Sequence, residues 1–123
     1  MNQSTQNYKD LVVWQKGIQL AKRIYAVARG FPSEERFGLT SQMRRAAVSI
    51  PSNIAEGQAR HTTQEFIQFV SHAEGSAAEL DTQIILAVEL SFCCKVDVLP
   101  IYELNDEIRR MLNGLRRKLS ERK

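Results

Sequence analysis

The sequence has few of the features that mark secreted, membrane-spanning or disulfide-bonded proteins. Its only cysteines, Cys93 and Cys94, are adjacent, and neighbouring cysteines rarely reach disulfide geometry without strain. We therefore expect both to be small buried apolar residues in a reducing compartment. No stretch reaches the roughly 20 uncharged apolar residues of a membrane-spanning helix, and MNQSTQNYKDLVVW has neither the basic nor the apolar region of a signal peptide. These absences predict a cytoplasmic protein without a membrane segment.

Residues with catalytic or metal-binding spacing are missing too. The two histidines, His61 and His72, share no metal-ligand spacing with each other or with the cysteines. The sequence holds no glycine-rich phosphate loop, catalytic triad or paired acid and base. We expect no metal, no cofactor and no enzymatic activity. An enzyme that uses Glu56 or Glu79 as a buried base is the alternative that this pattern leaves open.

Apolar residues instead recur at helical spacing along most of the chain, without strand-like alternation. The pattern predicts four helices: residues 10–30 with Asp10 as N-cap, residues 39–59, a helix of nearly thirty residues begun by the capping box of Thr62 and Glu65, and residues 97–118 with Asp97 as N-cap and Pro100 in its first turn. Short connections favour an all-α fold, an antiparallel up-down four-helix bundle. We expect one domain over residues 1–123 with flexible ends at 1–9 and 119–123.

The third predicted helix ends in an unusually apolar segment, IILAVELSFCC, at residues 84–94. Apolar residues fall on almost every side of this segment, and a helix on the outside of a monomeric bundle would expose them to water. We therefore expect another chain to cover this part of the protein.

A proline lies inside the second predicted helix, in the stretch QMRRAAVSIPSNIAEG at residues 42–57. Pro51 has no N–H to donate to the carbonyl of Ala47, which costs about 3 kcal/mol unless neighbours compensate. The sequence therefore predicts a kink at Pro51, with Ser49 or Ser52 as a donor for the freed carbonyl.

A polar stripe runs beside the apolar face of the same helix. It consists of Arg45, Ser49, Ser52 or Asn53, and Glu56. Such residues usually face water, but here they are mostly short, and small residues such as Gly57 would let another backbone approach closely. We expect a buried polar network that fixes helix packing, with Arg45 paired to Glu74 or Glu79.

Positive charge is concentrated at the C-terminal end. Residues 109–123 hold seven Lys or Arg and one acidic residue, whereas residues 1–108 hold ten and thirteen. The predicted binding residues on the outer face of the last helix are Arg109, Arg110, Arg116, Arg117 and Lys118. This pattern predicts phosphate contacts with RNA or DNA. The alternative is that these cations favour a helix C-terminus and solubility, partly neutralised by Glu103, Asp106 and Glu107.

Three stretches, LVVWQKGIQLAKRIY, FPSEERFGLTSQMRRAAVSIPSNIAEG and GSAAEL, resemble the four-helix-bundle family encoded in intervening sequences of large-subunit (23S) ribosomal RNA genes. The likeness spans nearly the whole chain. It implies a ring-shaped homopentamer without known enzymatic activity. The accessory variability protein of diversity-generating retroelements is similar in fold, and it is a basic, nucleic-acid-binding partner of a reverse transcriptase. The positions that the resemblance assigns to structure and assembly are Arg44, Arg45, Ser49, Pro51, Asn53, Glu56, Gly57 and Glu79.

Taken together, these patterns predict a cytoplasmic, oligomeric, non-enzymatic protein that contacts RNA or DNA through its last helix. The alternative function is a protein–protein scaffold whose partner docks on the ring.

Overall fold

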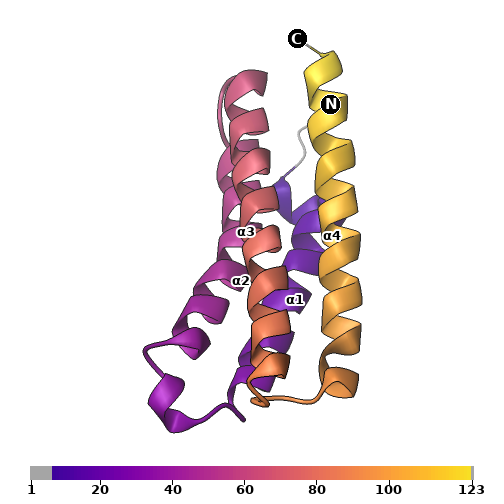
Figure 1. Cartoon of the computed structure of the whole chain (residues 1–123). Helices are drawn as coiled ribbons and strands as arrows, with labels where there is room; N and C mark the ends of the chain where they lie inside the picture. The colour runs from indigo at the N-terminus through magenta and orange to yellow at the C-terminus, as the bar shows by residue number, and fades with distance from the viewer. Residues whose placement is uncertain (1–6, 123) are drawn as a thin grey trace.

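The computed structural model describes residues 7–122, which form an antiparallel up-down four-helix bundle. The elements are the 3₁₀ turn η1 (Tyr8–Asp10), α1 (Val12–Ala28), the 3₁₀ turn η2 (Ser33–Glu35), α2 (Leu39–Gln58), α3 (Thr63–Glu89) and α4 (Lys95–Glu121). Figure 1 shows each helix running opposite to the one before it. None of the helices is both long and apolar enough to cross a membrane. The predicted fold class is confirmed.

One apolar core runs between the four helices. Its largest fully buried members are Leu20 and Ile24 from α1, Met43, Ile50 and Ile54 from α2, Val70, Leu80 and Ile84 from α3, and Ile108, Leu112 and Leu119 from α4. They recur mostly three or four residues apart, so each helix presents one face to the others. Because full burial of such a side chain contributes about 1.5–3 kcal/mol, this core is what holds the helices together.

Two predicted N-caps are wrong, the first by one residue and the second by three. Asp10 belongs to η1, whose own cap is the side chain of Asn7, and the N-cap of α1 is Leu11 without a side-chain hydrogen bond. The N-cap of α4 is Cys94, and Asp97 lies inside the first turn. There its carboxylate is close to the positive end of the helix, which is favourable without being a cap.

Helix α3 starts as predicted. The Thr62 hydroxyl oxygen accepts a hydrogen bond from the backbone N–H of Glu65 at 3.1 Å. The hydroxyl also donates to the Glu65 carboxylate at 3.0 Å, so the acid bonds the hydroxyl and not the N–H of Thr62 as in a full capping box.

Helix α4 differs from the prediction at both ends. Pro100 lies beyond the first turn, and the helix continues past Lys118 to Glu121. Leu119 is only 1% exposed and belongs to the core. The flexibility expected for residues 119–123 stays a prediction. Residues 1–6 and 123 of the expected flexible ends lie outside the described residues.

The α1–α2 connection (residues 29–38) and the α3–α4 connection (residues 90–94) lie at the same end of the bundle, the lower end in Figure 1. Phe31 from the first and Phe92 from the second pack with ring centroids 5.6 Å apart. We call this end the connection end. The end of α3 and the start of α4, which flank the second connection, also lie at this end.

Candidate binding surfaces

The proline of α2 is buried against α1. A Cβ placed on Gly17 would lie 3.3 Å from the Cβ and 3.4 Å from the Cδ of Pro51, so the missing side chain of Gly17 leaves room for the proline ring. Helix α2 is continuous from Leu39 to Gln58 through Pro51, and the kink stays a prediction. Pro51 therefore acts in packing between α1 and α2.

A half-buried polar contact joins α2 to α3, as the polar stripe predicted. The hydroxyl oxygens of Ser49 and Ser76 are 2.8 Å apart. The Asn53 amide donates to the Ser49 hydroxyl at 2.9 Å and to the Ser49 carbonyl at 2.7 Å. Two of the predicted residues thus belong to a helix-packing network, whose third member, Ser76, the sequence did not identify.

The charged members of the stripe are not part of this network. Arg45, Glu56 and Glu79 are exposed, and the expected pairing of Arg45 with Glu74 or Glu79 is absent from the ion pairs of the described residues. Glu74 is instead bound by Arg116. Glu56 pairs with Arg60 at 3.0 Å in an exposed position. Because Glu56 and Glu79 are both exposed, neither is a buried base.

Two further motif residues have tight surroundings. The Arg44 guanidinium lies 4.7 Å from the centre of the Tyr25 ring, and its buried Nε has no hydrogen-bond partner within the described part of the chain. A Cβ on Gly57 would lie 2.6 Å from the Cβ of Phe69 and 3.0 Å from Cδ1 of Phe66. Gly57 therefore permits the close approach of α2 and α3 that its small size predicted.

Three of the five predicted basic binding residues are engaged by acids. Arg116 Nε donates to Glu74 on α3 at 2.6 Å, and this hydrogen bond and the charge of Glu74 raise the pKa of Arg116. The guanidinium of Arg109 lies 3.7 Å from Asp81, also on α3.

The third engaged residue, Arg110, pairs with Asp106 one helical turn earlier, as the charge pattern predicted. The remaining two are different: Arg117 donates a hydrogen bond to the amide oxygen of Asn113 at 3.5 Å and has no carboxylate partner in the described part of the chain. Lys118 is exposed and has no ion pair among residues 7–122. The positive charge available at this end is therefore smaller than the sequence suggests.

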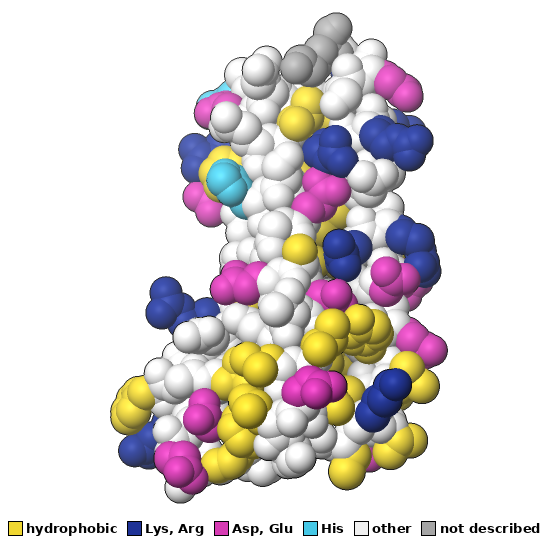
Figure 2. Space-filling view, viewed as in Figure 1, with side chains coloured by type: hydrophobic (Ala, Val, Ile, Leu, Met, Phe, Trp, Pro, Cys, Tyr) yellow, Lys and Arg dark blue, Asp and Glu magenta, His cyan; other side chains and the backbone are white. Residues whose placement is uncertain are grey.

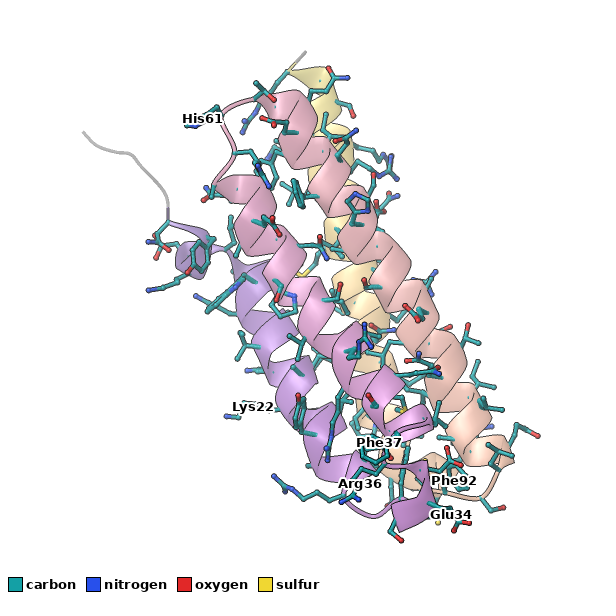
Figure 3. All side chains as sticks on the ribbon, turned by 90° about the vertical axis from the view of Figure 1, so that its left-hand side faces the viewer. Lys22, Glu34, Arg36, Phe37, His61 and Phe92 are labelled. Atoms are coloured by element: carbon teal, nitrogen blue, oxygen red, sulfur yellow. The ribbon has the colours of Figure 1, made fainter. Side chains whose placement is uncertain are left out.

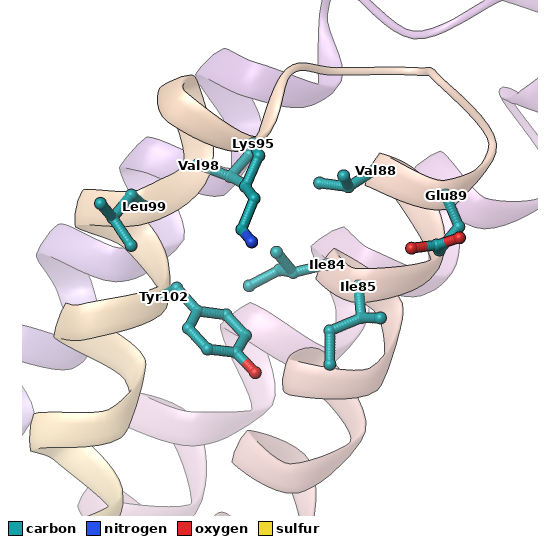
Figure 4. Close-up of a pocket in the computed structure, with 8 residues that line it drawn as sticks. All are labelled: Ile84, Ile85, Val88, Glu89, Lys95, Val98, Leu99 and Tyr102. Atoms are coloured by element: carbon teal, nitrogen blue, oxygen red, sulfur yellow. The ribbon is translucent and has the colours of Figure 1, made fainter.

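The apolar end of α3 forms an open groove with the start of α4. We call it the α3–α4 groove; its apolar lining is Ile84, Ile85, Val88, Val98, Leu99 and Tyr102, and its charges come from Glu89 and Lys95 (Figure 4). Its volume is about 310 Å³. Figure 2 shows apolar side chains gathered over this part of α3 and α4. The apolar surface that the sequence predicted at the end of α3 is thus present and uncovered.

The cysteines and histidines form no site. Cys93 is half-buried, and burial, with smaller effects of Cys94 and Asp97, raises the pKa of its thiol. Cys94 is exposed, so the prediction that it is buried is wrong. The ring of His72 packs against Phe69 at 5.9 Å. Within residues 7–122, no three His, Cys, Asp or Glu side chains are grouped so as to hold a metal.

Comparison with known proteins gives a family and a fold. The model of the family described as 23S rRNA-intervening sequence protein matches residues 9–114, a range that ends before Arg116, Arg117 and Lys118. A solved structure from Bacteroides thetaiotaomicron, titled as a protein with unknown function from the S23 ribosomal protein family, is similar with a TM-score of 0.79. The two are 24% identical over 85% of this chain and 97% of that chain, a likeness that shows the fold alone. No curated protein matches this chain.

Proposed function

The chain belongs to the 23S rRNA-intervening sequence protein family, and we propose that it is a non-enzymatic binding protein that works as an assembly of identical chains. The observation that carries this proposal is the apolar surface around the α3–α4 groove. Ile85 and Leu99 in the groove are 47% and 48% exposed. A monomer rarely leaves a contiguous apolar surface of this kind in water.

Three more apolar residues close to the groove in sequence are also exposed. Leu86, Leu90 and Val96 are 45%, 49% and 75% exposed. Burying the exposed part of each of these five side chains contributes about 1 kcal/mol. The sum is near the lower end of the about 4–15 kcal/mol that association costs, so a stable assembly needs a further contact. The ring of five that the family resemblance implies is the size we predict.

The assembly is tested by the mass of the protein in solution. We expect light scattering to give a multiple of the 14.0 kDa chain mass at micromolar concentration. Ile85→Lys places a charge in the groove at a half-exposed position, so the variant is expected to stay folded by circular dichroism and to be monomeric. The control is Val12→Lys, which changes an equally exposed apolar residue, 52%, at the other end of the bundle. A monomeric wild-type protein would refute the proposal.

The absence of enzymatic activity is supported by the surroundings of the two candidate bases. Glu56 and Glu79 are both exposed, and Glu56 is paired with Arg60. Neither carboxylate therefore has the buried surroundings with a specific charge partner that mark a functional acid or base.

Binding of RNA or DNA at the C-terminal end of α4 is the second candidate function. The observation in its favour is that Arg117 and Lys118 are exposed and have no carboxylate partner in the described chain. Arg117 also lines a shallow depression with Arg109 and Arg110, to which Glu74 and Asp106 contribute carboxylates. An assembly repeats this group in every copy, and repeated cations attract phosphates in a salt-dependent way.

This function is tested by fluorescence anisotropy with a structured RNA and a duplex DNA at about 50 and 200 mM salt. The variant of choice is Arg117→Gln with Lys118→Gln, because Arg116 also holds Glu74 and its removal would disturb α3. The control is Lys22→Gln with Arg23→Gln, another exposed pair of cations, on α1. We expect only the first variant to lose affinity. Absence of binding by the wild type at the lower salt would leave a protein–protein scaffold as the function of the assembly.

A further inference from the structure

One apolar side chain of the α1–α2 connection lies almost fully in water. Phe37 is 87% exposed, more than any other large apolar residue of the described chain. The guanidinium of the neighbouring Arg36 lies 5.0 Å from the centre of its ring. Figure 3 shows the two side chains next to each other beside the start of α2. Phe37 therefore contributes little to the core, and its apolar ring is accessible to another molecule.

The α3–α4 groove has the size and chemistry to receive such a ring. An apolar cavity of about 150 Å³ accommodates benzene, and the groove has a volume of about 310 Å³. The side chain of Ile84 is 1% exposed and forms part of its inner surface, while Ile85 and Leu99 are about half exposed. A phenyl ring inserted here would contact apolar atoms from two helices.

The charges around the two features are complementary. The exposed Glu34 and Arg36 lie close to Phe37 in sequence, and the exposed Lys95 and Glu89 belong to the groove. The carboxylate of Glu35 is engaged by the backbone N–H of Leu39. A chain that inserts Phe37 therefore brings the exposed Glu34 and Arg36 to a groove whose exposed charges are Lys95 and Glu89. This match favours a second copy of the same chain over an uncharged apolar ligand.

The two features lie on different surfaces of the chain, as a head-to-tail contact requires. Phe37 precedes α2, whereas the groove is built from α3 and α4 only. Both lie towards the connection end, where Phe31 and Phe92 join the two connections. A contact between two different surfaces at the same height places copies side by side without a shift along the bundle axis. Such head-to-tail contacts close into a ring when the rotation between copies permits.

We propose that Phe37 of each chain inserts into the α3–α4 groove of the next chain, so that the copies form a closed head-to-tail ring. This inference rests on the proposed self-assembly and supplies the further contact that the apolar surface requires. Phe37 is then the central apolar residue of the interface, and Glu34, Arg36, Glu89 and Lys95 lie around it.

The first test compares Phe37→Ser with the wild type by light scattering over a dilution series. The exposed position of Phe37 means that the variant keeps the helical circular dichroism of the wild type. We expect its dissociation constant to rise about thirtyfold or more, the effect of losing a central interface residue. The control Val12→Ser is expected to assemble like the wild type. A Phe37→Ser protein that assembles as tightly as the wild type overturns the inference, while the proposed self-assembly stands if Ile85→Lys is monomeric.

The second test mixes two variants that each lack one side of the contact. Phe37→Ser keeps an intact groove, and Ile85→Lys keeps an intact Phe37. In a head-to-tail contact the mixture forms a one-to-one dimer with twice the chain mass of 14.0 kDa, because no further copy can join. No association in the mixture, or species larger than this dimer, overturns the inference. A wild-type protein that is itself a dimer also overturns it, since two copies related by a twofold axis do not form the proposed ring.

Discussion

Substitution of Gly57 by alanine tests how closely α2 and α3 approach. The added Cβ would lie 2.6 Å from the Cβ of Phe69, where ordinary contacts begin near 3.4 Å. Every residue except glycine has a Cβ, so no rotation of the Phe69 side chain can relieve this contact. The backbones of the two helices must move apart by most of an ångström.

The expected loss of stability is the difference between two opposing effects. Overpacking a core position costs about 1–3 kcal/mol, and the upper part of this range applies because the obstacle is attached directly to a backbone. Against this, alanine is about 1 kcal/mol better than glycine inside a helix. We therefore expect Gly57→Ala to lower the free energy of unfolding by about 1–2 kcal/mol.

The matched control is Gly75→Ala on α3. A Cβ at Gly75 meets no atom within 4 Å, so only the helix preference changes and stability should rise by about 0.5–1 kcal/mol. Both variants are compared with the wild type by urea unfolding at one fixed protein concentration, because assembly makes apparent stability depend on concentration. The same chemical change is thus expected to have opposite signs at two helical glycines.

A Gly57→Ala protein that unfolds at the same urea concentration as the wild type, or at a higher one, would refute the expected crowding between α2 and α3. Equal destabilisation by Gly57→Ala and Gly75→Ala would also refute it, because the effect would then be unrelated to the contact with Phe69. The comparison also requires that the slope of the free energy of unfolding against urea concentration is the same in both variants and the wild type. An equal slope shows that unfolding exposes the same amount of surface in each protein.

Two further predictions concern charge and thiol chemistry. Arg116→Gln should lower the free energy of unfolding by about 1 kcal/mol at low salt and by less at high salt, because the side chains of Arg116 and Glu74 are only 34% and 23% exposed. Arg110→Gln removes the more exposed pair with Asp106 and should change the free energy of unfolding by less than about 0.5 kcal/mol. Equal losses for the two variants in urea unfolding would contradict this ranking. In single-thiol variants at pH 8, the Cys93 thiol, whose pKa is raised by burial, should react with an aromatic disulfide reagent several times more slowly than the exposed Cys94 thiol; similar rates in the spectrophotometric assay would contradict this.

The helices could be predicted from sequence because their apolar spacing is local information. The exact starts of α1 and α4 could not, because η1 takes Asp10 out of the cap position and Asp97 is equally favourable within the first turn. The Thr62 cap was predictable because its partner, Glu65, is three residues away. Local patterns therefore determine the elements better than their ends.

The candidate sites depend on residues that are distant in sequence. Arg116 is held by Glu74, which is 42 positions away, and only the packing of α3 against α4 shows that its charge is engaged. The apolar excess at residues 84–94 did signal the uncovered surface. The contribution of Leu99 and Tyr102 to the groove requires the relative rotation of two helices, and the exposure of Phe37 requires the path of a connection. Neither is present in a periodic pattern.

Because Gly17 and Pro51 are in contact, the residue at one position limits which residues fit at the other. With proline at position 51, any side chain at position 17 meets the ring at about 3.3 Å. Replacing Pro51 by alanine would remove the Cδ contact but leave the Cβ contact, so it would relieve only part of the crowding. The effects of changes at the two positions should therefore not add. Substitution of Gly17 is therefore constrained by a residue on another helix, and the stability of the intermediate protein depends on which of the two positions changes first.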